Sequence, residues 1–273
     1  MLKDITLGQY FPLDSCIHKL DPRVKILLTL FYIILIFFVH SVSGYLLVGF
    51  FTLFLIFLSK VPLKVVIKSV KPLLIIIFIT AFINLFFTGG EKVVFSWKFI
   101  KITENGIINA VSMALRLVFL VMGSSLLTYT TSPILLTDGI ERLLSPFSKI
   151  GLPSHELAMM MTIALRFIPT LLEETEKIIM AQKSRGADFE SGNLLKRAKA
   201  LVPVLVPLFI SSFRRADELA TAMECRCYRG GKGRTSLRQL KINSADVLSI
   251  VIFAIFCAVL VLINVYNIRI MGY

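Results

Sequence analysis

The chain has 273 residues, of which 56% are hydrophobic, and it carries a formal net charge of +13 from 30 Lys and Arg against 17 Asp and Glu. Soluble domains are usually 45–50% apolar, so this composition excludes an ordinary soluble domain and favours a chain that has the bilayer as its solvent. In a soluble protein the positive charge would suggest nucleic acid. Here the basic residues lie beside apolar runs, so we expect contact with anionic lipid headgroups and no nucleic acid.

Five apolar runs predict membrane-spanning helices, because about 20 apolar residues cross the hydrocarbon. The first two runs are short enough to need flanking turns. The runs are Ile26–Val39, Tyr45–Leu58, Leu73–Phe87, Ile107–Tyr129 and Val247–Val265. The sequence therefore predicts an all-α integral membrane protein with about five transmembrane helices.

The basic residues also predict orientation. Lys and Arg precede the first span, the turn His40–Gly44 has none, and four lysines lie between the second and third spans. Because cytoplasmic loops are enriched in Lys and Arg, we place the N-terminus in the cytoplasm and the loop Thr88–Asn105 outside. We expect a membrane domain over 1–130, a cytoplasmic module over 131–245 and a final transmembrane helix over 246–273.

The segment between the fourth and fifth spans has a different character. Residues 132–244 contain 17 Lys and Arg and 11 Asp and Glu, which is too charged for a span. Apolar residues recur there at steps of three and four, which predicts helices over Ile134–Ile150, Ser154–Arg185 and Leu194–Arg226. Each of the last two would be about 45–50 Å long. Pro203 and Pro207 are expected to bend the last one.

Both long helices end on one Arg between two small residues. The endings are Ser184-Arg185-Gly186 and Cys225-Arg226-Cys227. An Arg at a helix C-terminus suits the helix dipole, and its five donors can engage carboxylates or carbonyls of a partner that small neighbours allow to approach. The alternative is that Arg is simply common in last turns, and physics alone leaves both interpretations open.

Several motifs taken together resemble the T component of energy-coupling factor transporters, a class of ATP-binding cassette importers. They are the two Arg endings, Ala164-Leu165-Arg166-Phe167-Ile168-Pro169, Arg214-Arg215-Ala216-Asp217-Glu218-Leu219-Ala220 and the N-terminal run from Ser15 to Lys25. The resemblance covers nearly the whole chain. It implies a non-catalytic subunit of a prokaryotic plasma-membrane importer for vitamins or other micronutrients. It further implies two ABC ATPase subunits and a membrane-embedded, substrate-binding S component as partners.

By the same resemblance, Arg185 and Arg226 are the ATPase-docking residues, with Ser184, Gly186, Cys225 and Cys227 as their small flanks. The second ending departs from the family's Ala-Arg-Gly by carrying Cys on both sides. The S component is expected on the apolar stripes of the two long helices. The residues proposed for that contact are Met159, Met160, Met161, Leu165, Leu205 and Leu208; ordinary core packing is an equal alternative for the methionines.

No catalytic, cofactor or metal site is predicted. The run from Gly230 to Thr235 looks like a phosphate-binding loop but lacks the first Gly of that motif, and its Lys232 is followed by Gly233. The three His residues are scattered. The Cys225 and Cys227 pair has no second Cys or His pair nearby to complete a metal site.

Two other functions share this architecture. A stand-alone channel or secondary transporter should show ionisable residues deep in its spans. Arg116 is the one such residue well inside a predicted span, and we expect it to bind a neighbouring carbonyl or to snorkel. A membrane scaffold with a helical cytoplasmic module is the third candidate, and it differs only in its partners. The sequence does not identify the solute.

Overall fold

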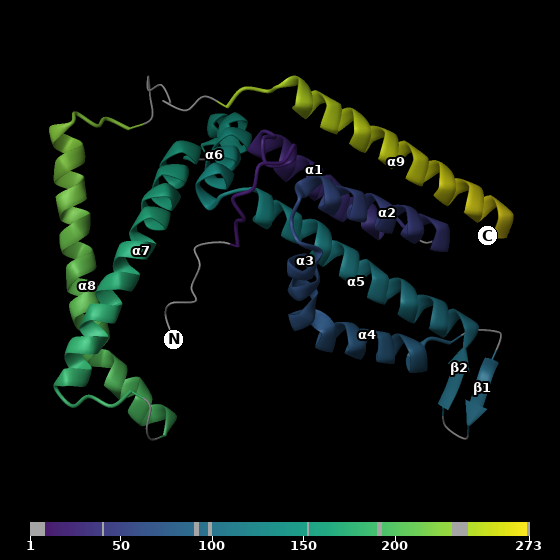
Figure 1. Cartoon of the computed structure of the whole chain (residues 1–273), viewed down its shortest axis with the longest axis horizontal. Helices are drawn as coiled ribbons and strands as arrows, with labels where there is room; N and C mark the ends of the chain where they lie inside the picture. Colours follow the sequence, from purple (N-terminus) through teal and green to yellow (C-terminus); the bar gives the residue numbers. More distant parts are fainter. Residues whose placement is uncertain are drawn as a thin grey trace. The chain divides into compact units, whose positions relative to one another are not determined.

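The computed structural model describes residues 9–39, 41–89, 93–97, 100–151, 153–189, 193–230 and 240–271. These residues form nine α-helices, two short 3₁₀ helices and one β-hairpin, so the predicted all-helical membrane class is confirmed (Figure 1). The chain divides into two compact units. We call Gly8–Gly139 with Leu240–Tyr273 the membrane unit, and Ile140–Gln239 the inserted unit.

The helices of the membrane unit begin where the sequence supplies caps. The Asp21 side chain accepts a hydrogen bond from the Arg23 amide at the start of the first helix, and Ser41 and Thr103 accept from backbone amides at the starts of the second and fifth helices. The helices of this unit are α1 (Pro22–Phe37), α2 (Val42–Ser59), α3 (Leu63–Val70), α4 (Leu74–Phe87), α5 (Glu104–Thr130) and α9 (Ser244–Met271). A 3₁₀ turn, Lys71–Leu73, joins α3 to α4, and α6 (Pro133–Leu144) follows α5.

The stretch between α4 and α5, predicted as a loop, contains an antiparallel hairpin. Its strands are β1 (Val93–Trp97) and β2 (Ile100–Thr103), and a register irregularity lies between Val93 and Phe95. The β-branched and aromatic side chains in this stretch suit a strand, a short-range signal that the search for long apolar runs passed over.

Helix α5 lies at the centre of the membrane unit and packs on α1, α2, α3 and α4. It packs closely on α1 at Gly123, where a Cβ would lie 2.1 Å from Cε1 of Tyr32. The Tyr32 hydroxyl is fixed by the Thr52 hydroxyl at 2.7 Å and donates to the Phe119 carbonyl at 3.3 Å. Gly123 therefore permits the close packing of three helices around one tyrosine.

Five helical segments are long and apolar enough to span a membrane, as predicted, but one of them differs from the prediction. The segments of sufficient length and hydropathy are Val42–Ser59, Leu63–Phe87, Glu104–Thr130, Ser154–Ser184 and Ser244–Tyr266. The predicted first span is too short, because α1 has only 16 residues, about 24 Å against about 30 Å of hydrocarbon. Ser154–Ser184, which the sequence assigned to the cytoplasmic module, qualifies by length and composition alone and is the least apolar of the five.

The short α1 has its C-terminal carbonyls satisfied by side chains from other helices. Asn264 of α9 donates to the Phe38 carbonyl at 2.7 Å, and Tyr45 donates to the Val39 carbonyl at 3.1 Å. Arg116 of α5 also donates to the Val39 carbonyl, at 3.2 Å, and its guanidinium lies 5.8 Å from the Phe37 ring centroid. The prediction that Arg116 binds a neighbouring carbonyl is confirmed. Such partners matter because lipid offers an exposed carbonyl no hydrogen bond.

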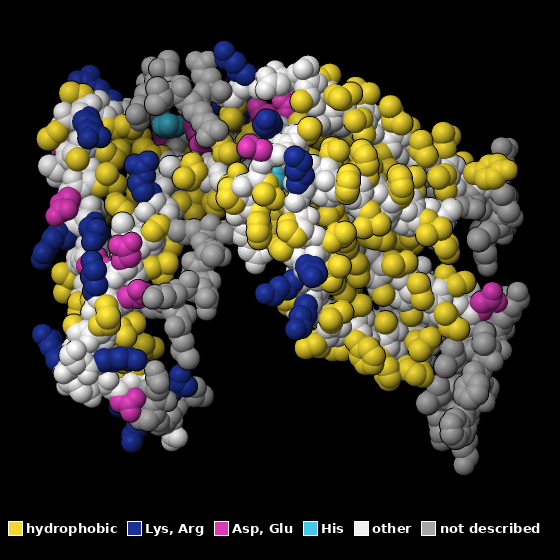
Figure 2. Space-filling view, viewed as in Figure 1, with side chains coloured by type: hydrophobic (Ala, Val, Ile, Leu, Met, Phe, Trp, Pro, Cys, Tyr) yellow, Lys and Arg dark blue, Asp and Glu magenta, His cyan; other side chains and the backbone are white. Residues whose placement is uncertain are grey.

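The inserted unit consists mainly of two long helices, α7 (Ser154–Ser184) and α8 (Leu194–Cys225). A 3₁₀ turn, Ser145–Ile150, precedes them, and Gly151 ends that turn with a φ of 92°. Side-chain contacts run from α7 residue 174 to α8 residues 211 and 215, and from α7 residue 182 back to α8 residue 203. The two helices therefore pack antiparallel, and they cross in Figure 1. In Figure 2 this pair carries Lys, Arg, Asp and Glu along its length, whereas the surface of the membrane unit is largely apolar.

Candidate docking ends of the inserted unit

One ion pair joins the two long helices. Arg215 Nη2 donates to Glu174 Oε2 at 2.6 Å, and the Ser211 hydroxyl donates to Glu174 Oε1. The side chains of Arg215 and Glu174 are 39% and 22% exposed, so solvent screens the pair only in part. Both carboxylate oxygens of Glu174 are thus used by α8. The contact ties the second half of α7 to the second half of α8.

The two predicted docking arginines follow this ion pair at equal spacing along their helices. Arg185 follows Glu174 by eleven residues, and Arg226 follows Arg215 by eleven residues. Eleven residues of helix are three turns, or about 16 Å. Because the helices are antiparallel, the two arginines lie on opposite sides of the ion pair. Both are exposed.

A second contact satisfies a carbonyl that proline leaves free. Pro207 has no N–H, so the Pro203 carbonyl lacks its usual partner within α8. Gln182 Nε2 of α7 approaches that carbonyl at 3.5 Å, the long end of the hydrogen-bond range. The two prolines therefore lie inside a continuous helix, and the neighbouring helix supplies a donor.

Both docking ends have the same backbone geometry. The amide of Ala187 donates to the Gln182 carbonyl at 3.0 Å and that of Gly186 to Lys183 at 3.0 Å. In α8 the amide of Tyr228 donates to Met223 at 3.0 Å and that of Cys227 to Glu224 at 2.8 Å. These paired bonds define a Schellman motif. Arg185 and Arg226 occupy the C-cap position in each, both with a φ of −89°.

The residue after each Arg must take up a left-handed conformation. Gly186 has a φ of 87° and Cys227 a φ of 57°. The sequence analysis treated Cys227 only as a small flank of Arg226. A Gly supplies this conformation without strain, whereas a residue with a Cβ pays roughly 1–2 kcal/mol for it. The flanks Ser184, Cys225 and Cys227 are exposed beside their arginines.

The residues predicted for S-component contact do not form one patch. Met160 and Met161 are 55% and 46% exposed, while Met159 and Leu165 are half-buried. All four precede Glu174 on α7. Leu205, 58% exposed, and Leu208, half-buried, precede Arg215 on α8. In an antiparallel pair these two groups lie on opposite sides of the Glu174–Arg215 ion pair.

A broader apolar surface on α8 was missed by the sequence analysis. Seven side chains between residues 201 and 213 are 46–65% exposed: Leu201, Val202, Leu205, Val206, Phe209, Ile210 and Phe213. Phe209 and Phe213 contact each other edge to face, with ring centroids 4.7 Å apart. The signal was present, because this stretch is apolar almost without interruption. The sequence analysis counted only apolar residues spaced three or four apart, so it did not identify this wider surface.

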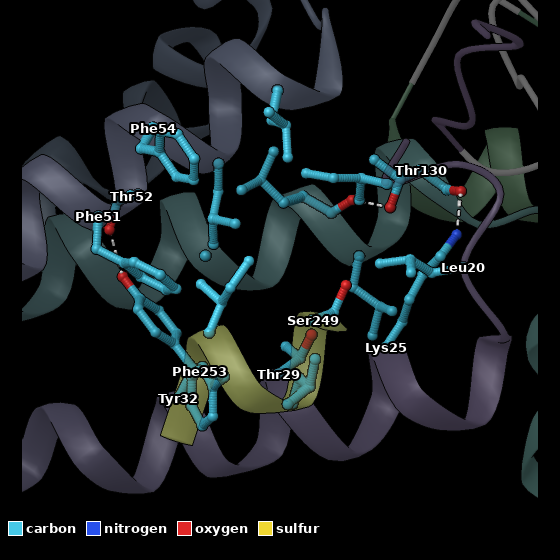
Figure 3. Close-up of a pocket in the computed structure, with 18 residues that line it drawn as sticks. Leu20, Lys25, Thr29, Tyr32, Phe51, Thr52, Phe54, Thr130, Ser249 and Phe253 are labelled. Carbon is cyan, nitrogen blue, oxygen red and sulfur yellow. Dashed lines mark hydrogen bonds between the residues drawn. The ribbon is translucent and has the colours of Figure 1, made fainter. Parts of the chain in front are cut away.

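The membrane unit holds a cavity of about 130 Å³ lined by side chains of α1, α2, α5 and α9 (Figure 3). Apolar side chains dominate its lining. The hydrogen-bonded pair Tyr32 and Thr52 lies at one end, and Lys25 and Thr130 lie at the other. The Lys25 ammonium already has an acceptor for each of its three N–H groups. Among the described residues, this cavity offers a polar solute no free charge.

Comparison with known proteins agrees with this architecture. The cobalt transport protein family, CbiQ, matches residues 14–237. A protein of Clostridium kluyveri named "Energy-coupling factor transporter transmembrane protein EcfT" is 63% identical over 250 residues, covering 91% of this chain and 93% of that protein. Proteins of the same name from Acidaminococcus fermentans and Bacillus subtilis are 60% and 44% identical. They cover 94% and 95% of this chain and 96% and 98% of their own lengths.

The matches include both Arg endings and the N-terminal run that carried the resemblance. With this identity over nearly the full length, and with the apolar helices described above, the chain belongs to the CbiQ family and, within it, to EcfT, the multi-pass transmembrane proteins of energy-coupling factor transporters.

Proposed function

We propose that this protein couples two ABC ATPase subunits to a membrane-embedded S component, so that ATP-driven motion releases a bound vitamin or other micronutrient into the cytoplasm. The N-terminus and the inserted unit face the cytoplasm in this proposal. In the same proposal, the protein is a non-catalytic subunit of a plasma-membrane importer. One observation supports the proposal: two exposed arginines occupy equivalent C-caps, each eleven residues after its member of an ion pair that joins the two helices.

Each docking end suits insertion into a groove. The Schellman bonds satisfy the last helix carbonyls internally, so the guanidinium is left to engage the partner. The exposed small flanks Ser184, Gly186, Cys225 and Cys227 let a partner surface come close to the backbone. Each ATPase subunit would receive one arginine.

The Glu174–Arg215 ion pair and the Gln182–Pro203 contact join α7 and α8, so we expect the two helices to move together. When nucleotide closes the ATPase pair, the two docking ends move with it, and packed helices shift as rigid units. The apolar stretch from Leu201 to Phe213 and the methionines at the start of α7 supply surface for the S component. Met adapts to different partners, which suits one coupling protein serving several S components.

The test is the double substitution Arg185→Glu and Arg226→Glu in the assembled transporter. We expect the ATPases to be lost on affinity purification and ATP-dependent uptake to stop. The matched control, Lys177→Glu with Lys199→Glu, changes the charge equally, with one exposed site in each helix, and should retain both. If the Arg double variant keeps its ATPases and transports, the docking proposal is wrong.

A further inference from the structure

The chain passes out of the membrane unit at Gly139 and returns to it at Leu240. Both points contact the same short segment, the turn Asp21–Lys25 at the start of α1. This turn belongs to the N-terminal run of the sequence, to which the proposed function assigns no role. It contains two of the most buried charged groups among the described residues, Asp21 and Lys25, each 5% exposed.

The outgoing chain is held by Lys25 and Pro22. Lys25 Nζ donates to the Thr130 carbonyl at 2.9 Å, to the Thr131 hydroxyl at 3.3 Å and to the His18 carbonyl at 3.1 Å. Figure 3 shows its side chain reaching Thr130. At Gly139 a Cβ would lie 3.0 Å from Pro22 Cβ and 3.4 Å from the Pro22 carbonyl carbon. The outgoing chain therefore lies directly on the first turn of α1.

The returning chain is held by Arg23 and by a buried carboxylate. Arg23 Nη2 donates to the Leu240 carbonyl at 3.2 Å, while its Nε and Nη2 bind the Asp21 carboxylate at 3.1 and 2.8 Å. Asp246, 1% exposed, accepts from the Asp21 amide at 2.7 Å and from the Asn243 amide at 2.7 Å. One carboxylate thus joins the starts of α1 and α9.

We propose that the Asp21–Lys25 turn is a coupling clamp, whose residues position both connections of the inserted unit against α5 and α9. Two unrestrained connections would absorb movement of the inserted unit by bending. Connections fixed to a common turn deliver that movement to the ends of two transmembrane helices. The inference rests on the proposed function, because it assumes that the inserted unit moves during transport.

The experiment compares variants that loosen the clamp in the full transporter reconstituted in liposomes. Thr131→Val removes one acceptor of Lys25 without changing side-chain size, and Thr131→Ser keeps it. Gly139→Leu forces the outgoing chain off Pro22, whereas Gly89→Leu adds the same side chain where a Cβ meets nothing within 4 Å. Arg23→Gln releases the Leu240 carbonyl, and Lys19→Gln changes an exposed neighbour.

Three readouts are taken for each variant: co-purification of the ATPases, ATP hydrolysis, and solute taken up per ATP hydrolysed. For Thr131→Val, Gly139→Leu and Arg23→Gln we expect normal co-purification, continued hydrolysis and a fall of about fivefold or more in uptake per ATP. Thr131→Ser, Gly89→Leu and Lys19→Gln should keep the ratio of the unaltered protein.

A purely structural role would give a different pattern. If the three clamp variants lower only the amount of folded protein, or lower uptake and hydrolysis in the same proportion, the clamp proposal is overturned. Failure of the proposed function is seen separately, because it would appear as ATPases retained by the Arg185 and Arg226 double variant.

Discussion

Glu174 and Arg215 form a 2.6 Å ion pair at corresponding points of two helices, each eleven residues before an exposed C-cap arginine. The offset between the two members of the pair is the same as the offset between the two arginines. The two docking ends are therefore equally spaced, in residues, from the ion pair that joins α7 to α8.

Reversing the charge of one member of this pair should weaken the contact between α7 and α8, and exchanging the two side chains should restore it. Glu174→Arg and Arg215→Glu each bring like charges together, while the double exchange re-forms an opposite pair. For a partly exposed pair we expect a coupling energy of about 0.5–1 kcal/mol in a double-mutant cycle of thermal unfolding. Glu173→Arg, at an exposed neighbour, serves as the control. Strictly additive effects of the two reversals would show that the pair contributes nothing.

Cys227→Gly should stabilise the end of α8. The substitution removes the Cβ from a residue whose φ is 57°, and we expect a gain of about 0.5–1 kcal/mol after the extra chain entropy of Gly. Cys225→Gly, two residues earlier and still helical, should instead destabilise by up to about 1 kcal/mol. Hydrogen exchange of the amides of residues 227 and 228 measures both. Faster exchange in Cys227→Gly would contradict the strain argument.

Gly123→Ala should destabilise the membrane unit. The new Cβ would lie 2.1 Å from a Tyr32 ring that is 4% exposed and held by Thr52, so the ring cannot simply swing away. Overpacking of this kind costs about 1–3 kcal/mol. Thermal unfolding of the purified protein in detergent tests the prediction, with Gly89→Ala as a control in open space. Equal stability of the two variants would count against a close α1 and α5 contact.

Asn264→Leu should destabilise the C-terminal end of α1, because the Phe38 carbonyl loses its 2.7 Å donor. Hydrogen bonds between transmembrane helices contribute about 0.5–2 kcal/mol, so the expected loss is of that size. Unfolding in a mixed-micelle titration with sodium dodecyl sulfate measures it. Asn109→Leu, at an exposed position of α5, is the comparison and should change stability little.

Local signals in the sequence predicted most of the helices. The expected helices Ser154–Arg185 and Leu194–Arg226 begin where α7 and α8 begin and end within one residue of them. These features depend on the conformational preferences of single residues and on apolar periodicity, which act over a few turns. The hairpin at Val93–Trp97 and Ile100–Thr103 was missed because long apolar runs, not alternation, were sought.

Contacts between residues far apart in the chain could not be predicted from the sequence. Nothing in the chain pairs Glu174 with Arg215, or Lys25 with Thr130, 105 residues away, until the helices are placed. The strain at Cys227 was hidden for a related reason. Its left-handed backbone follows from where α8 ends relative to Arg226, and a one-residue uncertainty in a helix end changes that assignment.

The ion pair between Glu174 and Arg215 also has a consequence for the timing of the two ATPases in the proposed function. Because α7 and α8 are joined to each other, neither docking end can move far unless the other helix follows. Two different ATPases would then deliver their motion to the membrane together, and a slower ATPase on one side would delay both helices.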